Sequence, residues 1–235
     1  MKAFLYGIGL QWKLNARSKE ILVHYYLVPL IFYVFIGGLF TSIDPASVDT
    51  VIQSMTVFGI TMGGVLGSPY PLVEFYGSDI KKSYQVGGIP VWTAAAGNFI
   101  SGVLHLFLMS MVILLTAPFL FDATLPGYLP GYFLTLILLI MASLSIGMVF
   151  GLFLKSASKL GMATQLVFLP SIMLSGMMFP RTLLPQILQN IGKFFPATWG
   201  FQGMCQSGIE QADVLALLVF CLAGLGISLV KLKRI

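Results

Sequence analysis

Two histidines, His24 and His105, lie within long apolar stretches of this 235-residue chain and are its first candidates for chemistry. His105 lies near the middle of its stretch, where an imidazole could relay protons across a membrane. A histidine that packs and forms hydrogen bonds is the more common case, and we favour it here. Cys205 and Cys221 have neither metal-ligand spacing nor a disulfide framework, so Cys221 is expected to pack as a small apolar residue.

The sequence lacks the phosphate-binding loop G-x-x-x-x-G-K-[ST] of many nucleotide hydrolases. The nearest fragment, Gly192-Lys193, continues into Phe194 and offers no hydroxyl for Mg²⁺. No Ser/His/Asp arrangement, H-E-x-x-H motif or carboxylate pair suited to hydrolysis is present. We therefore predict a protein that is not an enzyme, binds no cofactor or metal itself, and takes energy for any uphill transport from a partner.

The elements that must position these residues are membrane-spanning helices. Of the residues, 57% are hydrophobic and only 9% are charged, and the mean hydropathy is +0.94. A soluble enzyme needs about 25% charged residues and a disordered chain is polar, so both classes are excluded. The predicted fold is an all-α polytopic membrane protein, because its apolar runs are continuous and about 20 residues long. The six expected spans are Ile21–Phe40, Val51–Leu72, Val91–Phe121, Gly131–Leu154, Leu160–Phe179 and Ala212–Val230. The third is long enough to be tilted, to extend beyond the bilayer or to break near Pro118.

The basic residues predict the orientation of these spans. If six helices alternate, eleven of the 13 Lys and Arg residues fall on one side, leaving Arg181 and Lys193 opposite. Basic residues concentrate on the cytoplasmic side, so both termini are expected in the cytoplasm of a cell carrying this protein in its plasma membrane. No basic stripe suits a phosphate backbone, so no nucleic-acid partner is expected.

Residues 1–20 are expected to form an amphipathic interfacial helix that leads into the first span. At helical spacing one apolar and one polar face result. The apolar face holds Phe4, Leu5, Ile8, Trp12 and Ala16, and the polar face holds Lys2, Lys13, Arg17 and Glu20; Leu10 and Asn15 interrupt the pattern.

Residues 74–90 form the longest cytoplasmic excursion that the pattern predicts, and they mix charges with aromatic side chains. A short helix over Asp79–Gln85, capped by Ser78 or Gly77, would expose Phe75, Tyr76 and Tyr84 as a docking site. A solvated connector whose lysines only set the topology is an equal alternative. The candidate docking residues are Glu74, Phe75, Tyr76, Ser78, Asp79, Lys81 and Lys82.

Prolines at 170, 180, 185 and 196 interrupt the region after the fifth span. Only about ten residues separate Pro185 from Pro196, too few to cross a bilayer. We expect a re-entrant or interfacial helical hairpin over residues 180–200, or a structural lid. Before it, Met173, Met177, Met178 and Phe179 are candidates for a substrate path, although lipid-facing or core packing is the more common role of such residues.

Small residues repeat every four positions on two of the spans. Such stripes let helices approach closely, and they serve packing within one chain more often than a subunit interface. The stripes are Gly59, Gly63 and Gly67 on the second span, and Gly147 and Gly151 on the fourth.

This layout over the whole chain resembles the ABC-2 type transporter permeases, the membrane subunits of type V ATP-binding cassette exporters. The most specific match is Leu174-Ser175-Gly176 followed by Phe179-Pro180 and Pro185. Glu74, Gly77 and Ile89-Pro90 are similar to the family's loop after the second span, whereas Phe75 and Tyr76 stand where the family often has an arginine.

The resemblance implies one transmembrane domain over residues 1–235 that pairs with a second permease copy or a sibling. It also implies two cytoplasmic ATPase subunits, which would bind the ATP and Mg²⁺ and grip residues 74–90 as a coupling helix. The broken helices of residues 180–200 would form the extracellular gate. The expected cargo is a hydrophobic or amphipathic compound, such as a drug or an antimicrobial peptide.

Three alternatives stay open. A polysaccharide or glycolipid exporter needs a wide aromatic passage, and Tyr128, Tyr132 and Trp199 form no obvious track. A proton-coupled carrier would use His105. A membrane scaffold or immunity protein would sequester a peptide without moving it.

Overall fold

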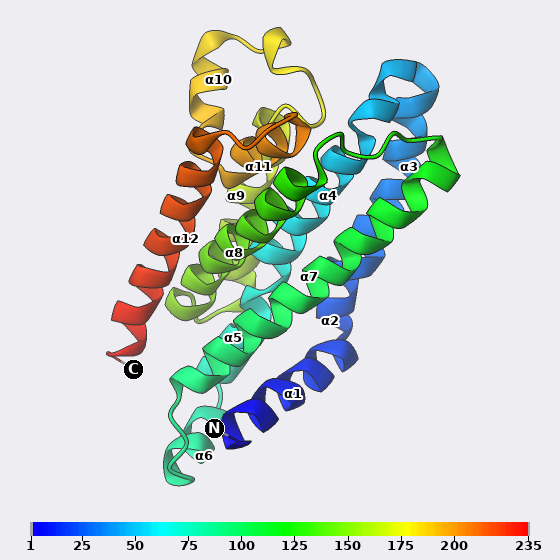
Figure 1. Ribbon diagram of the computed structural model, residues 1–235. Helices are drawn as coiled ribbons and strands as arrows, with labels where there is room; N and C mark the ends of the chain where they lie inside the picture. Colours follow the sequence, from blue (N-terminus) through cyan, green and yellow to red (C-terminus); the bar gives the residue numbers. More distant parts are fainter. Residues whose placement is uncertain (1, 235) are drawn as a thin grey trace.

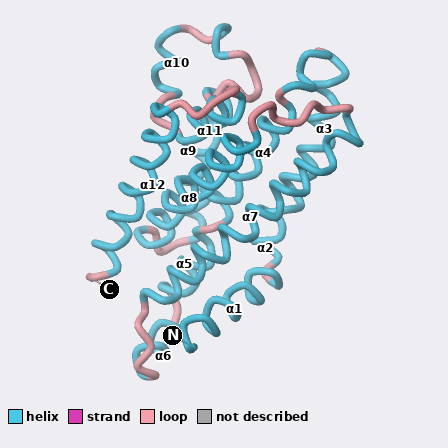
Figure 2. Tube along the Cα trace, in the orientation of Figure 1, coloured by secondary structure: helices cyan, strands magenta, loops and turns pink. Residues whose placement is uncertain are grey.

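The computed structural model describes the backbone of residues 2–234, and the side chains of residue 9 and residues 11–234. Throughout this part of the chain the structure consists of helices and connections, with no strand (Figures 1 and 2). Six helical segments are long and apolar enough to span a membrane, which confirms the predicted fold class. They are α2 (Lys19–Leu22) with η1 (Val23–Leu27) and α3 (Val28–Ile43); α4 (Val51–Thr61) with η3 (Met62–Gly67) and α5 (Pro69–Gly77); α7 (Trp92–Phe121); α8 (Leu129–Phe153); α9 (Ala157–Leu174); and α12 (Gln211–Leu232).

The helical segments alternate between the two ends of the molecule (Figure 1). The end that we call basal holds both chain ends and the short helix α6 (Ile80–Val86). The end that we call apical holds the 3₁₀ turns η2 (Pro45–Asp49) and η4 (Arg181–Leu183) and the helix α10 (Gln186–Gly192). This separation is the one that the charge pattern predicts, while the side of the membrane that each end faces remains a prediction.

The structure decides two points that the sequence left to be tested in the third and fifth spans. Helix α7 continues through Pro118 for 30 residues without a break, a length of about 45 Å. Helix α9 ends at Leu174, so the prediction that the fifth span reaches Phe179 is wrong. Pro170 lies inside α9 without ending it, and the helix instead stops before Gly176, whose φ of +93° is a conformation that favours glycine.

The second span, α4–η3–α5, lies at the centre of the bundle. Every residue from Val51 to Gly67 is buried, including the polar side chains of Gln53, Ser54, Thr56 and Thr61. The Thr56 and Tyr132 hydroxyls share a hydrogen bond of 3.1 Å between this span and α8. Lipid can therefore reach the surrounding helices but not this part of the central span.

Both glycine stripes pack within the chain. A Cβ at Gly147 on α8 would collide with the Gly64 carbonyl oxygen and the Ser68 hydroxyl of the central span. On the central span, Gly63 and Gly67 lie against Tyr25 of η1. The π-helical turns η1 and η3 are thus in contact where a larger residue would not fit.

The amino-terminal helix α1 (Lys2–Arg17) packs along α7 and ends at Ser18, whose hydroxyl accepts a hydrogen bond from the Ile21 N–H of the first span. Asn15 is buried and donates a 2.9 Å hydrogen bond to the Ser101 hydroxyl of α7, while Ala16 is exposed. The predicted apolar face is therefore wrong at Ala16, because Asn15 can be buried once Ser101 satisfies its amide. The predictions for Lys2, Phe4, Leu5, Ile8 and Leu10 fall outside the described side chains.

Candidate functional site

The α5–α6 turn protrudes at the basal end of the molecule (Figure 1). Glu74, Phe75 and Tyr76, which the sequence places in a loop, form the last turn of α5. The connection itself is two residues long, and the Ser78 hydroxyl accepts a 3.3 Å hydrogen bond from the Ile80 N–H at the start of α6. The predicted helix over Asp79–Gln85 is therefore present as Ile80–Val86, shifted by one residue.

Three aromatic side chains pack against one another inside this turn. Phe75 meets Tyr84 edge-on at 4.8 Å and Tyr76 at 5.0 Å between ring centroids, and the Tyr76 hydroxyl donates to the Val91 carbonyl at 3.0 Å. All three rings are half-buried. They are less exposed than the sequence suggests, because they pack on one another and hold α6 against α5, and their role in docking stays a prediction.

A different set of apolar side chains is exposed on the turn. Val86 is 91% exposed, and Ile80 and Ile89 are each nearly half exposed. We call these three residues the basal tip. Sequence reasoning missed them, since an isolated valine before Gly87-Gly88 has no periodic apolar pattern around it.

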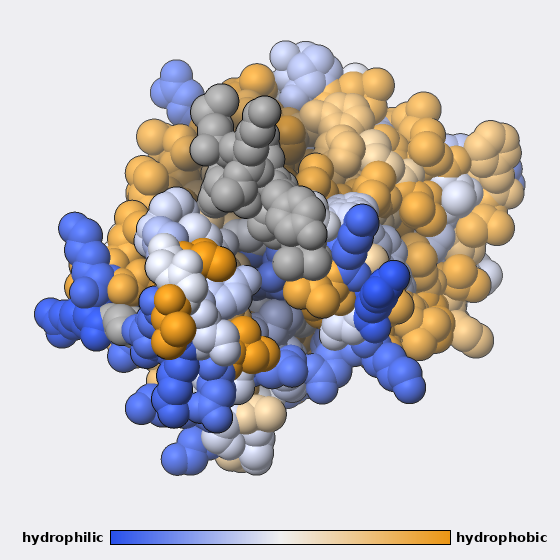
Figure 3. Space-filling model, turned by 90° about the horizontal axis from the view of Figure 1, so that it is seen from below, coloured by the Kyte–Doolittle hydropathy of each residue, from blue (hydrophilic) through white to orange (hydrophobic). Residues whose placement is uncertain are grey.

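Charges surround the basal tip. Lys82 and Asp79 form an ion pair of 2.8 Å on α6, and both side chains are strongly exposed, so the pair contributes little stability. Glu74 and Ser78 are also exposed and Lys81 is half-buried. Among the described residues, the Glu74 carboxylate has no ion-pair partner. Figure 3 views the basal end and shows hydrophilic residues gathered on this face, with hydrophobic residues on the flanks.

At the apical end the chain turns sharply after α9. The Ser175 hydroxyl donates to the Ile172 carbonyl at 2.9 Å and accepts from the Met177 N–H at 3.3 Å. Gly176 then reverses the chain beneath the Arg181 side chain, which covers it so closely that a Cβ would collide. This turn places Met177 in the core, leaves Met178 half-buried and leaves Phe179 exposed.

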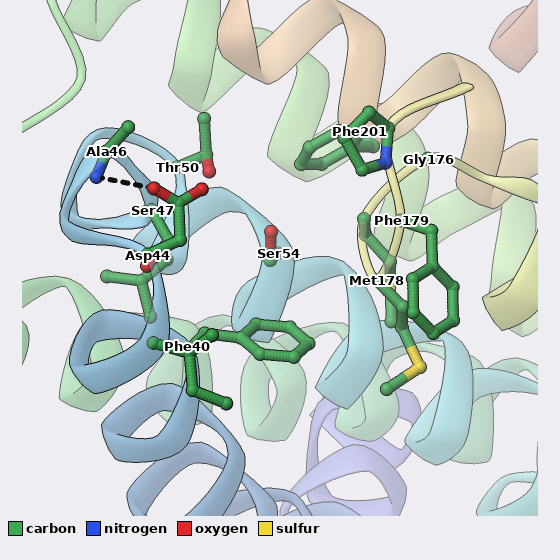
Figure 4. A pocket seen from close by; sticks show the side chains of 14 residues that line it. Phe40, Asp44, Ala46, Ser47, Thr50, Ser54, Gly176, Met178, Phe179 and Phe201 are labelled. Atoms are coloured by element: carbon green, nitrogen blue, oxygen red, sulfur yellow. Dashed lines mark hydrogen bonds between the residues drawn. The ribbon is translucent and has the colours of Figure 1, made fainter. Parts of the chain in front are cut away.

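A cavity of about 520 Å³ lies beside this turn (Figure 4). One wall comes from the end of α3, η2 and the start of α4, and the other from residues 176–180 and Phe201. Three of the four sequence candidates, Met177, Met178 and Phe179, line it, whereas Met173 lies outside it on an exposed face of α9. The lining residues are Phe40, Ile43, Asp44, Ala46, Ser47, Thr50, Val51, Ser54, Gly176, Met177, Met178, Phe179, Pro180 and Phe201.

The region 180–200 forms two helical pieces, α10 and α11 (Pro196–Cys205), as the proline spacing indicates. Helix α10 is largely exposed, while α11 is mostly buried against α8, α12 and α4. Hydrogen bonds hold the pair: the Arg181 guanidinium donates to the Gln202 side chain at 2.9 Å, and the Thr198 hydroxyl donates to the Gly192 carbonyl at 2.6 Å. The hairpin is therefore a fixed cap at the apical end, and its depth in a membrane remains a prediction.

His105 belongs to neither site: it lies on α7 and contacts α1 and η1. Its ring stacks on Trp12 with centroids 3.9 Å apart, and its Nδ1 forms a 2.7 Å hydrogen bond with the Tyr26 hydroxyl. In the part of the chain that the structure describes, no three His, Cys, Asp or Glu side chains gather as metal ligands.

The sequence is similar to membrane proteins of one known family. A family model described as "ABC-2 type transporter" matches residues 4–208. The chain is also 32% identical over 163 residues to the inner membrane transport permease YhhJ of Escherichia coli K12, and equally to its Shigella flexneri counterpart. The match covers 67% of this chain and 42% of each permease, so the chain spans less than half of their length. The six apolar helical segments are those of a multi-pass membrane protein, in agreement with these matches. The chain belongs to the ABC-2 type transporter family.

Proposed function

We propose that the chain is the permease subunit of an ATP-driven exporter for hydrophobic or amphipathic compounds, such as drugs or antimicrobial peptides. The basal tip is the observation that carries this proposal. Exposed Ile80, Val86 and Ile89 form a small apolar surface ringed by charge at the end of a helical turn. A protein groove can bury such a knob, and charged neighbours fix its orientation.

The partner that fits the basal tip is a cytoplasmic ATPase subunit, two of which would serve two permease copies. The ATPase supplies the nucleotide site that this sequence lacks, including the bound ATP and Mg²⁺. When ATP binds, the two ATPase subunits close on each other, and this closure displaces the basal tip. The turn transmits that movement because Phe75, Tyr76 and Tyr84 lock α6 onto α5.

The central span links the two sites mechanically. Helix α5 continues through η3 into α4, whose first residues Val51 and Ser54 line the apical cavity. A shift at α6 therefore reaches the cavity through one continuous helical segment, which is buried among the surrounding helices from Val51 to Gly67. In this proposal the cavity is part of the cargo path, and α10 and α11 form its outer gate.

Val86→Asp tests this function directly. An exposed side chain is changed, so the fold survives, but the new carboxylate cannot be buried in an apolar groove. We expect ATPase co-purification and ATP-driven efflux from liposomes to fall about tenfold or more. The double variant Glu74→Ala with Asp79→Ala is expected to lower efflux as well, with membrane insertion unchanged.

Ser158→Asp is the matched control, because it adds the same charge at an exposed basal position away from α6. Its efflux is expected to equal that of the unmodified chain. Without the ATPase, the chain is expected to move no cargo whether ATP or a proton gradient is supplied. Unchanged efflux in Val86→Asp, or accumulation of cargo by the chain alone, would contradict the proposal.

A further inference from the structure

The apical cavity has the size and lining of a small-molecule site. Its volume of about 520 Å³ lies within the usual range of ligand pockets, about 300–1,000 Å³. Phe40, Met178, Phe179 and Phe201 supply most of its aromatic and thioether surface (Figure 4). Flexible, polarizable methionines beside aromatic rings suit apolar groups of variable shape.

One charged group, the carboxylate of Asp44, lies among the lining residues. One of its oxygens accepts a 3.0 Å hydrogen bond from the Ala46 N–H at the start of η2, which fixes the side chain. Figure 4 shows the other oxygen turned toward the cavity, across from Met178 and Phe179. Within the described residues this carboxylate has no ion-pair partner.

The surroundings leave that negative charge uncompensated. Arg181 directly follows residues 176–180, which form the second wall. Its guanidinium donates hydrogen bonds to the Gln202 side chain and to the Gln189 carbonyl. The hydroxyl of Ser47, another lining residue, is buried without a hydrogen-bond partner in the described part of the chain. The apical end as a whole carries five acidic against two basic side chains: Asp44, Asp49, Asp122, Glu210 and Asp213 against Arg181 and Lys193.

We infer that the apical cavity binds lipophilic organic cations, with apolar groups between Phe40, Met178 and Phe179 and the positive charge beside Asp44. This inference rests on the proposed function and deepens it by naming the class of cargo. Asp44 is exposed, so its attraction to the cation is modest, and the apolar walls add to the affinity by holding the apolar groups of the ligand. The ring faces and methionine sulfur add favourable contacts to a cation, whereas an anion is repelled.

The test measures equilibrium binding of radiolabelled tetraphenylphosphonium to the full chain in nanodiscs, with empty nanodiscs subtracted. Triphenylphosphine oxide serves as the neutral probe. The unmodified chain is expected to bind the cation saturably and more tightly than the neutral probe. Asp44→Asn keeps the oxygen that accepts from Ala46, and it is expected to raise the dissociation constant for the cation roughly fivefold.

Three further variants complete the design. Asp122→Asn removes the same charge at the same end but outside the cavity, and asparagine tolerates the φ of 52° found there, so its binding is expected to be unchanged. Asp44→Glu restores the charge and is expected to recover the preference for the cation. Phe179→Ala is expected to weaken the binding of both the cation and the neutral probe.

The inference is overturned if tetraphenylphosphonium does not bind saturably, if the neutral probe binds equally well, or if Asp44→Asn binds like the unmodified chain. Because no ATPase is present in this assay, its result is separate from the efflux experiment. ATP-driven efflux of other cargo without cation binding would remove this inference and leave the proposed function standing. Cation binding without ATP-driven efflux would remove the proposed function and leave the cation site standing.

Discussion

At the scale of single residues, buried polar side chains position the helices. Trp12, Asn15 and Ser101 tie α1 to α7, and Tyr26 with His105 ties η1 to α7. Each of these contacts joins residues far apart in the chain. A buried amide that loses its partner retains the full cost of desolvation, so such contacts are specific as well as stabilising.

Asn15→Ala is predicted to destabilise the protein by about 1–2 kcal/mol, because the Ser101 hydroxyl loses its donor in a buried position. The measurement is the free energy of unfolding in detergent micelles. Leu14→Ala, one residue away on an exposed face of α1, is the control and is expected to change the stability little. Equal stabilities of the two variants would show that the Asn15 hydrogen bond does not hold α1 in place.

At the scale of elements, the central span depends on glycine contacts with its neighbours. Gly147 of α8 brings that helix against the backbone of η3, where the Ser68 hydroxyl donates to the Gly64 carbonyl at 2.7 Å. Asn98 of α7 donates to the Ser68 carbonyl at 2.9 Å on the same turn. Three helices therefore meet at the π-helical turn η3, and their spacing is set by backbone rather than by flexible side chains.

Gly147→Ala is predicted to destabilise the protein by about 1–3 kcal/mol, since the added methyl group collides with backbone that cannot rotate away. Thermal unfolding in detergent measures this effect as a lowered midpoint. Gly226→Ala on α12 is the matched control, because a Cβ there meets nothing within 4 Å. Equal midpoints for the two alanine variants would show that Gly147 does not set the spacing of these helices.

At the scale of the whole molecule, the two ends differ in charge and in the candidate site that each carries. The basal end carries the tip formed by Ile80, Val86 and Ile89, and the apical end carries the cavity and the excess of acidic residues. The positive-inside rule predicts that the basal end faces the cytoplasm, which is the side that the proposed ATPase partner requires.

This orientation predicts opposite labelling of Ser83→Cys on α6 and Lys193→Cys after α10, each in a chain whose native cysteines are replaced. A membrane-impermeant maleimide is expected to label only Lys193→Cys in intact cells and only Ser83→Cys in inside-out vesicles. Both positions are exposed, so a lack of label reports the membrane side rather than burial. Labelling of both from the same side would contradict the topology, and the reverse pattern would invert it.

The sequence alone determined the six spans, their alternation and the short helix after the second span, because these depend on local apolar length, charge and turn residues. It also singled out Met177, Met178 and Phe179, which line the cavity, and Met173, which does not, and their role in a substrate path stays a prediction.

Only the tertiary structure decided which side chains are free. Phe75, Tyr76 and Tyr84 pack against one another, which leaves Val86 as the most exposed apolar residue of the turn. Asn15 is buried because the hydroxyl of Ser101, 86 positions along the chain, accepts a hydrogen bond from its amide. The cavity likewise joins residues 40–54 to residues 176–201. Contacts between such distant positions follow from the packing of whole helices, which no local pattern of residues specifies.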